Sequence, residues 1–246
     1  MPNPTGPQGR ALTIGLNSMG KNFAGFDQLT VAEADAQDMA AIAKSRGFAT
    51  KTLLAKRATR KAVVAELTAA AKALGPGDIF LLSFSGHGDQ LPDRNRDEKD
   101  LRDEAWCLYD RNLIDDELFG LWAKFKSGVR VLVFSDSCHS GTILRVDFGA
   151  FGRDRRKKHK ASRKKVQASV LLISACQDSE KAYEDRFNSV FVAALKRAWN
   201  NGRFRGDYKA FRNEIDRRMT SGSQRPNLFT VGTKTAAFKR QTPFTI

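Results

Sequence analysis

The stretch that decides the fold is Ile79-Phe80-Leu81-Leu82-Ser83-Phe84-Ser85-Gly86-His87-Gly88, where an apolar run leads into a histidine between two glycines. The run predicts a buried strand from Ile79 to Ser83. Glycines allow close approach of the backbone to a ligand, so His87 is predicted at the rim of a sheet. An isolated histidine is more often a structural residue, but this context favours a functional one.

A second stretch repeats the pattern. The apolar run from Val129 to Phe134 predicts a strand that leads to Asp136-Ser137-Cys138-His139-Ser140-Gly141. Because a free cysteine is mostly protonated at neutral pH, with a pKa near ~8.5, a cysteine nucleophile needs an imidazole to take its proton. We therefore pair His87 with Cys138. Cys107 and Cys176 are flanked by apolar residues and are predicted to be buried and inert.

Strands and helices alternate along the chain. A capping box, Thr30-Val31-Ala32-Glu33, predicts that a helix begins at Thr30, and Gly47 ends it. The polar stretch from Asp89 to Asp103 is interpreted as a surface loop. Further strands are expected at 12–16, 48–54 and 169–174, and further helices at 63–74, 115–126, 190–199 and 208–219. This alternation predicts a parallel sheet covered on both faces, with ligands bound at the carboxyl ends of the strands.

Length and composition favour one soluble domain over residues 1–246. No apolar run approaches the ~18 residues of a membrane helix, so we expect no membrane partner. Met1 to Arg10 has Pro and Gly where a signal peptide would be apolar, so we expect a cytoplasmic protein. The three cysteines lack the spacing of a zinc site, so disulfides and a structural metal are not expected.

The formal net charge of +15 is concentrated in one segment. Residues 153–165 (RDRRKKHKASRKK) carry nine Lys or Arg and one Asp, and we expect a flexible loop over about 150–166. Such a segment could be a solvated loop or could bind anions through counterion release. It lacks the interleaved aromatic residues that stack on bases, so nucleic acid is not the favoured partner.

The two motifs, in this order on neighbouring predicted strands, resemble the caspase-like cysteine peptidases (peptidase family C14), in particular metacaspases and the bacterial metacaspase-like orthocaspases. The similarity runs from about Leu12 to Leu195, and further matching blocks are Asp103–Asp110, Ile114–Leu118 and Ile173–Asp178. The resemblance implies a caspase-like fold, a three-layer α/β/α sandwich with a mostly parallel central sheet.

The resemblance also implies peptide hydrolysis through a thioester. His87 would be the general base and acid, Cys138 the nucleophile, and the backbone amides of Gly88 and Cys138 the oxyanion hole, worth about 3 to 4 kcal/mol. No third catalytic residue can be named from the sequence.

Metacaspases cleave after Arg or Lys through an acidic S1 pocket. The matching positions are Asp35, Ser85 and Asp136, although Asp35 could instead be a solvated helix carboxylate. Ala32 stands where the family typically has a cysteine. We therefore expect protein or peptide substrates with a basic P1 residue.

Calcium is possible but disfavoured, and no cofactor is expected to be required. Asp115 and Asp116 match the acidic pair that helps to bind calcium in many metacaspases, and the acidic stretch from Asp97 to Glu104 could supply oxygen ligands. Arg145, however, stands where the calcium-dependent relatives have an aspartate.

Two alternatives stay open: a catalytically idle caspase fold that serves as a binding module, with a basic loop for nucleic acid or other anions, and a different Cys-His hydrolase such as a small-molecule amidase. An intact dyad and acidic S1 candidates favour a peptidase, which the metacaspase resemblance suggests is a monomer. An Arg- or Lys-specific enzyme would find scissile bonds between Arg153 and Lys165, so autoprocessing is predicted there.

Overall fold

The main sheet has the predicted parallel arrangement. The computed structural model describes residues 6–23, 25–92, 102–137, 166–175, 188–219 and 225–246. Within these residues, six strands lie in the order β2-β1-β3-β7-β8-β9, of which the first five run parallel and β9 runs antiparallel to β8. Their bounds are β1 Gly9–Gly15, β2 Ala49–Leu54, β3 Ile79–Gly86, β7 Arg130–Ser137, β8 Ser169–Ser174 and β9 Asn227–Gly232.

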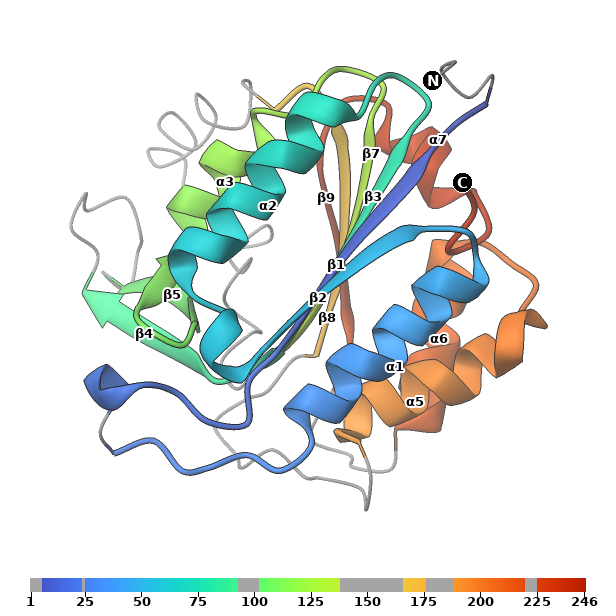
Figure 1. Cartoon of the computed structure of the whole chain (residues 1–246). Helices are drawn as coiled ribbons and strands as arrows, with labels where there is room; N and C mark the ends of the chain where they lie inside the picture. Colours follow the sequence, from blue (N-terminus) through green and yellow to red (C-terminus); the bar gives the residue numbers. More distant parts are fainter. Residues whose placement is uncertain (1–5, 24, 93–101, 138–165, 176–187, 220–224) are drawn as a thin grey trace.

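Helices cover both faces of this sheet (Figure 1). On one face lie α2 (Arg60–Ala73) and α3 (Asp115–Trp122), and on the other lie α1 (Ala32–Ser45), α5 (Val190–Trp199) and α6 (Tyr208–Arg218). The other helices in the part of the chain that the structure describes are α7 (Thr235–Lys239) and three short 3-10 turns, η1 (Lys21–Phe23), η2 (Ala55–Arg57) and η3 (Asn200–Gly202). The expected three-layer α/β/α sandwich is therefore confirmed.

The central strands are apolar on both sides because both sides are covered. In β3, Phe80 and Leu82 face the core formed with α2 and α3, whereas Ile79 and Leu81 face the core formed with α1, α5 and α6. Residue Phe84, next on the first face, stacks on Trp106 with ring centroids 4.6 Å apart. Each strand is thus fixed in register, which in turn fixes the positions of the residues at its carboxyl end.

The predicted capping box is wrong. Helix α1 begins at Ala32 with Val31 at the N-cap position, and no side chain of its own segment caps it. Asn17, from the loop after β1, caps it instead: its side-chain oxygen accepts from the Glu33 amide at 3.1 Å, and the Glu33 carboxylate accepts from the Asn17 amide at 3.3 Å. The orphan amide that the sequence assigned to Thr30 is therefore satisfied from a distant residue.

The predicted surface loop over 89–103 is also wrong at both of its described ends. A small antiparallel sheet contains β4 (Gly88–Pro92), β5 (Arg102–Cys107) and β6 (Asn112–Ile114), in that order. The stretch was predicted as a loop because its many charged residues do not show the alternation of polar and apolar residues that is typical of a strand. Residues 93–101 lie outside the described part. The helix expected over 115–126 ends at Trp122.

Candidate active site

The two motifs follow adjacent parallel strands. Strand β3 ends at Gly86 and β7 ends at Ser137, and the register pairs Ser85 with Asp136 and Gly86 with Ser137. His87 comes directly after the first strand. Cys138 comes directly after the second in the sequence, but it lies outside the described residues. The carboxyl ends of β3 and β7 are the edge at which an open α/β sheet binds its ligands.

His87 is held by its backbone and by its ring. Its carbonyl accepts from the Cys107 amide at 2.9 Å, and its side chain is buried with 9% of its surface exposed. Ring atom Nε2 lies 2.7 Å from the carbonyl oxygen of Asp27. Because a carbonyl can only accept, this hydrogen bond requires the proton on Nε2. In the neutral imidazole, Nδ1 is then the nitrogen that can act as a base.

The carbonyl of Asp27 is a functional group that the sequence did not reveal. It belongs to the loop between β1 and α1, which is far from His87 in the sequence. Every residue has a backbone carbonyl, so the type of side chain at a position does not indicate which carbonyl binds His87. Only the fold shows which one orients the histidine.

Gly88 pairs with Trp106 across β4 and β5. The neighbouring pair, His87 and Cys107, carries a backbone hydrogen bond. Antiparallel pairs alternate between bonded and non-bonded positions, so the amide of Gly88 points away from β5. This orientation is compatible with the oxyanion role expected of that amide. The second expected donor, the amide of Cys138, lies outside the described residues.

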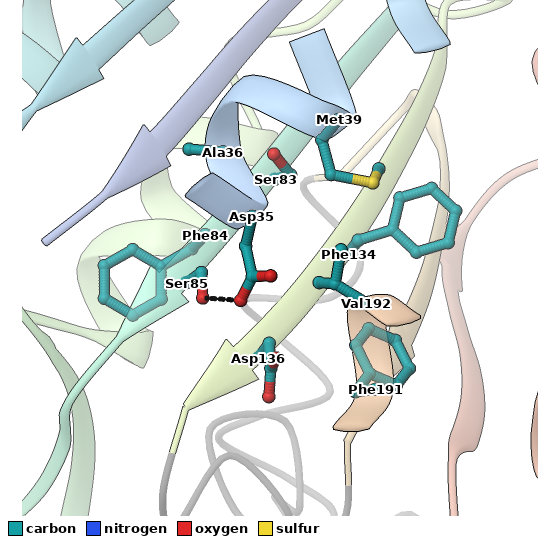
Figure 2. Close-up of a pocket in the computed structure, with 10 residues that line it drawn as sticks. All are labelled: Asp35, Ala36, Met39, Ser83, Phe84, Ser85, Phe134, Asp136, Phe191 and Val192. Atoms are coloured by element: carbon teal, nitrogen blue, oxygen red, sulfur yellow. Dashed lines mark hydrogen bonds between the residues drawn. The ribbon is translucent and has the colours of Figure 1, made fainter. Parts of the chain in front are cut away.

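Asp35 is buried and is not a solvated helix carboxylate. Helix α1 packs so closely on β1 that a Cβ at Gly15 would collide with the carbonyl of Ala32, one turn before Asp35. This close packing brings Asp35 over β3, where its Oδ2 accepts from the Ser85 hydroxyl at 2.9 Å (Figure 2). The structure thus brings together two of the predicted S1 residues.

The start of α5 completes the surroundings of Asp35. The Asn188 side-chain amide donates to Asp35 Oδ1 at 2.8 Å, and the backbone amide of Ser189 donates to the same oxygen at 3.2 Å. Burial raises the pKa of Asp35, and hydrogen bonds from Asn188, Ser85 and Ser189 oppose that shift. Asn188 and Ser189 were not among the residues predicted from the sequence. The signal that could have found them is a polar pair directly before an apolar helix, which is typical of an N-cap.

Asn188 also links Asp35 to the ion pair between Asp38 and Lys196. The same amide nitrogen lies 2.8 Å from Asp38 Oδ2, and the Asn188 side-chain oxygen accepts from Lys196 Nζ at 3.0 Å. Lys196 forms an ion pair with Asp38 at 2.7 Å. Asp38 therefore has a cationic partner, whereas Asp35 is held by neutral donors alone among the described contacts.

Asp136 is the third predicted S1 residue, and it faces the same space from β7 (Figure 2). Its Oδ2 is buried and has no hydrogen-bond partner among the described residues. Burial, together with the nearby charge of Asp35, raises the pKa of Asp136 to about 7, although a hydrogen bond from Ser189 opposes the shift. A buried carboxylate oxygen without a hydrogen-bond partner lowers the stability of the fold, and a bound cation would offset this loss.

A small pocket connects these groups. Its polar lining residues are Asp35, Ser83, Ser85 and Asp136, and apolar side chains from α1, the central strands and α5 form its walls (Figure 2). The apolar members of the lining are Ala36, Met39, Phe84, Phe134, Phe191 and Val192. Carboxylates surrounded by apolar walls suit a side chain with a methylene stem and a cationic end.

The structure describes only some of the other residues that the sequence singled out. Cys107 is fully buried, as expected, whereas Cys176 lies outside the described residues. No group of three or more His, Cys, Asp or Glu side chains that could hold a metal occurs in the described segments. Asp115 is buried at the start of α3, where its Oδ1 accepts from the Asp116 amide at 2.8 Å, so these two residues form a helix start. Residues 97–101, Arg145 and the basic segment 153–165 lie outside the described part.

None of the helices in the described segments is both long and apolar enough to span a bilayer.

The fold agrees with the caspase-type architecture that the sequence motifs resemble. A family model described as the caspase domain of peptidase family C14 matches residues 8–238. The chain therefore belongs to the caspase family of cysteine peptidases.

Curated relatives of this chain include metacaspases. The chain is 28% identical to metacaspase-3 from Arabidopsis thaliana over 208 residues, covering 74% of this chain and 55% of that protein. It is 32% identical to metacaspase-1 from Plasmodium falciparum over 133 residues, covering 52% of this chain and 22% of that protein. The chain thus spans at most about half the length of these two relatives.

Two solved structures are similar over almost the whole chain. Protein GSU0716 from Geobacter sulfurreducens is 46% identical, with a TM-score of 0.81, and the match covers 98% of this chain and 99% of that one. The structure titled pro-sf-caspase-1 is 12% identical with a TM-score of 0.57, covering 93% of both chains, and supports the fold alone.

Proposed function

We propose that the chain is a cysteine endopeptidase that cleaves peptide bonds after Arg or Lys. The observation that carries the proposal is the pocket lined by Ser85, two residues before His87, in which Asp136 has a buried oxygen without a partner and Asp35 has no cationic partner among the described residues. Two carboxylates at one site attract a cation more strongly than one does. A lysine ammonium or an arginine guanidinium would supply the missing charge and hydrogen bonds.

In the proposed reaction, Nδ1 of His87 takes the proton of the Cys138 thiol, and the thiolate attacks the carbonyl carbon of the P1 residue. Negative charge develops on the former carbonyl oxygen, where the amides of Gly88 and Cys138 would donate. The imidazolium then gives its proton to the leaving nitrogen, the C–N bond breaks and a thioester remains. Throughout, the carbonyl of Asp27 accepts from Nε2 and stabilises the positive ring.

Water completes the cycle. His87 takes a proton from a water molecule, the hydroxide oxygen attacks the thioester carbon, and the C–S bond breaks to release the acid and the thiolate. No step requires a metal, so we expect activity to persist in the presence of a calcium chelator.

Fluorogenic peptides with Arg, Lys or Asp at P1 test the proposal. Wild-type protein should cleave the Arg and Lys peptides, and His87→Ala and Cys138→Ala should lose that activity. Asp35→Asn and Asp136→Asn keep the side-chain size but remove the charge, so both should lower kcat/KM for Arg by at least about 100-fold, since a buried charged pair contributes roughly 3 kcal/mol or more. Asp216→Asn on α6 is the matched control and should cleave like the wild type.

Cleavage after Asp, or activity that survives in both dyad variants, would show the proposal to be wrong. A folded wild-type protein that cleaves none of the peptides would instead favour an idle binding module.

The basic segment 153–165 is the proposed site of autoprocessing, since it offers nine Arg or Lys residues to an enzyme of this specificity. Purified wild-type chain should be cut there during incubation, whereas Cys138→Ala should stay at full length. Equal integrity of the two chains would contradict autoprocessing without affecting the peptide result.

A further inference from the structure

An exposed aromatic ring lies against the proposed general base. Among the residues that the structure describes, Phe26 is the only large apolar side chain that is exposed, with 39% of its surface accessible. Its ring meets the His87 imidazole edge to face, with centroids 5.2 Å apart and an interplanar angle of 67°. An exposed apolar ring beside a reacting group offers contact area for a ligand.

We propose that Phe26 forms an apolar S1′ subsite, which receives the side chain of the substrate residue directly after the scissile bond. This inference rests on the proposed peptidase function. It concerns the part of the substrate that follows the scissile bond, which the acidic P1 pocket does not bind.

The chemistry of the reaction sets the direction. The imidazolium must donate a proton to the leaving nitrogen, so that nitrogen and the residue it belongs to pass next to His87. The P1 side chain points instead toward Asp35 and Asp136, and Phe26 is not part of the lining of that pocket. A ring in contact with the imidazole but outside the P1 pocket is therefore within reach of the residue that carries the leaving nitrogen.

The ring is positioned before any substrate binds. Phe23 packs against Phe26 edge to face at 5.9 Å, and the Phe26 amide donates to the Phe23 carbonyl at 3.3 Å. The loop is fastened to the following β5–β6 connection, because the Gly20 amide donates to the Tyr109 carbonyl at 2.7 Å and the Asn22 side chain donates to the Asp110 carbonyl at 2.9 Å. A subsite that is already ordered loses little entropy when it binds.

The chemical class of the P1′ residue follows from the phenyl ring. An aliphatic or aromatic side chain would remove apolar surface from water on both partners, whereas glycine would leave the ring exposed. At about 25 cal/mol per Å² of buried apolar area, such a contact predicts a preference for Leu or Phe over Gly of about tenfold in kcat/KM.

Internally quenched peptides with Arg at P1 and Gly, Leu, Phe or Asp at P1′ test this inference. The wild type should prefer Leu and Phe. Phe26→Ala should reduce the Leu-to-Gly ratio of kcat/KM toward one, and Phe26→Leu should give an intermediate ratio. Phe204→Ala, which removes a partly exposed ring near α6, is the matched control and should keep the wild-type ratio.

A second measurement uses the acyl-enzyme, from which the P1′ residue has already left. Added leucinamide and glycinamide compete with water for the thioester, so their partition ratio reports the subsite directly. Phe26→Ala should weaken capture by leucinamide more than capture by glycinamide.

Equal rates for all P1′ residues in the wild type, with cleavage still dependent on P1 Arg, would overturn the subsite and leave the proposed function standing. An equal loss on every peptide in Phe26→Ala would also overturn it, since that result indicates a role in holding His87. Failure to cleave any peptide would overturn the proposed function and the subsite together.

Discussion

At the scale of single residues, the carboxylate of Asp136 affects both the stability of the fold and the proposed binding of substrate. Asp136 has a buried carboxylate oxygen without a hydrogen-bond partner, in a protein that would fold more easily with a neutral side chain there. In the proposed function, such a residue lowers stability and supplies a charge that binds the P1 side chain. These two effects can be measured together, because Asp136→Asn should raise the stability of the protein and lower its activity.

The first prediction concerns the pH dependence of stability at Asp136. Its pKa is about 7 in the folded protein and near its ordinary value of 3.8 when unfolded, so between these values the native state binds more protons than the unfolded state. Stability therefore falls as the pH rises from about 4 to about 7. Asp136→Asn cannot ionise, so we expect its Tm to exceed that of the wild type by several degrees at pH 8, and by less at pH 4.

Differential scanning calorimetry at the two pH values checks this, with Asp216→Asn as the control. The same titration affects binding, because a basic P1 residue needs the ionised carboxylate. KM for an Arg peptide should fall as the pH rises through about 7. A Tm of Asp136→Asn below that of the wild type at pH 8 would contradict the buried-charge argument.

The second prediction concerns Asn188, which we expect to position Asp35. Its amide donates to Asp35 and Asp38 and lowers the pKa of Asp35. A hydrogen bond to a charged group contributes about 1.5 to 3 kcal/mol, so Asn188→Ala should lower kcat/KM for Arg peptides by about tenfold or more. The loss should lie mainly in KM, and the fall of KM with pH should move to higher pH.

The shift of the pH profile separates positioning from simple damage to the fold, which would lower the amount of active enzyme at every pH alike. Asn213→Ala, at an exposed position on α6, is the matched control. An unchanged pH profile in Asn188→Ala would contradict the positioning role.

At the scale of elements, the sequence predicted the strands that carry the site better than the contacts that hold it. The apolar runs before His87 and Cys138 were long enough to place both motifs at strand ends, and Asp35 followed from the family motif. The carbonyl of Asp27 and the side chain of Asn17 could not be found in this way. Both contacts join distant segments, and in each of them one partner is a backbone group: the carbonyl of Asp27 itself, and the Glu33 amide that Asn17 binds.

The third prediction concerns the start of α1. Asn17 accepts from the Glu33 amide and donates to the Thr30 carbonyl at 3.1 Å, and it thus joins the loop that carries Asp27 to the helix that carries Asp35. Loss of an N-cap contact costs about 1 kcal/mol, so Asn17→Ala should lower Tm by about 2 to 4 °C. Thermal unfolding measures this, and a Tm equal to that of Asn213→Ala would contradict the assignment of the cap.

At the scale of the whole molecule, the last residues close the core behind α5. Phe244 is fully buried, stacks on Phe134 at 5.5 Å and meets Trp199 edge to face at 4.8 Å. The guanidinium of Arg130, at the start of β7, donates to the Thr245 carbonyl at 3.0 Å. Strand β7 is thus anchored to the end of the chain at one end and contributes Asp136 to the pocket at the other.

The fourth prediction uses this separation along β7. Phe244→Ala removes a buried ring and should cost about 3 to 5 kcal/mol of stability, a fall in Tm of roughly 10 °C or more. Because Phe244 is not part of the pocket lining, the ratio of kcat/KM for Arg over Asp peptides should stay at the wild-type value at temperatures where the variant is folded. Asp136→Asn should do the reverse, with higher stability at pH 8 and the selectivity lost. If Phe244→Ala changed the P1 ratio as much as Asp136→Asn does, the pocket would depend on packing of the whole strand, and its two carboxylates would not be sufficient to explain the selectivity.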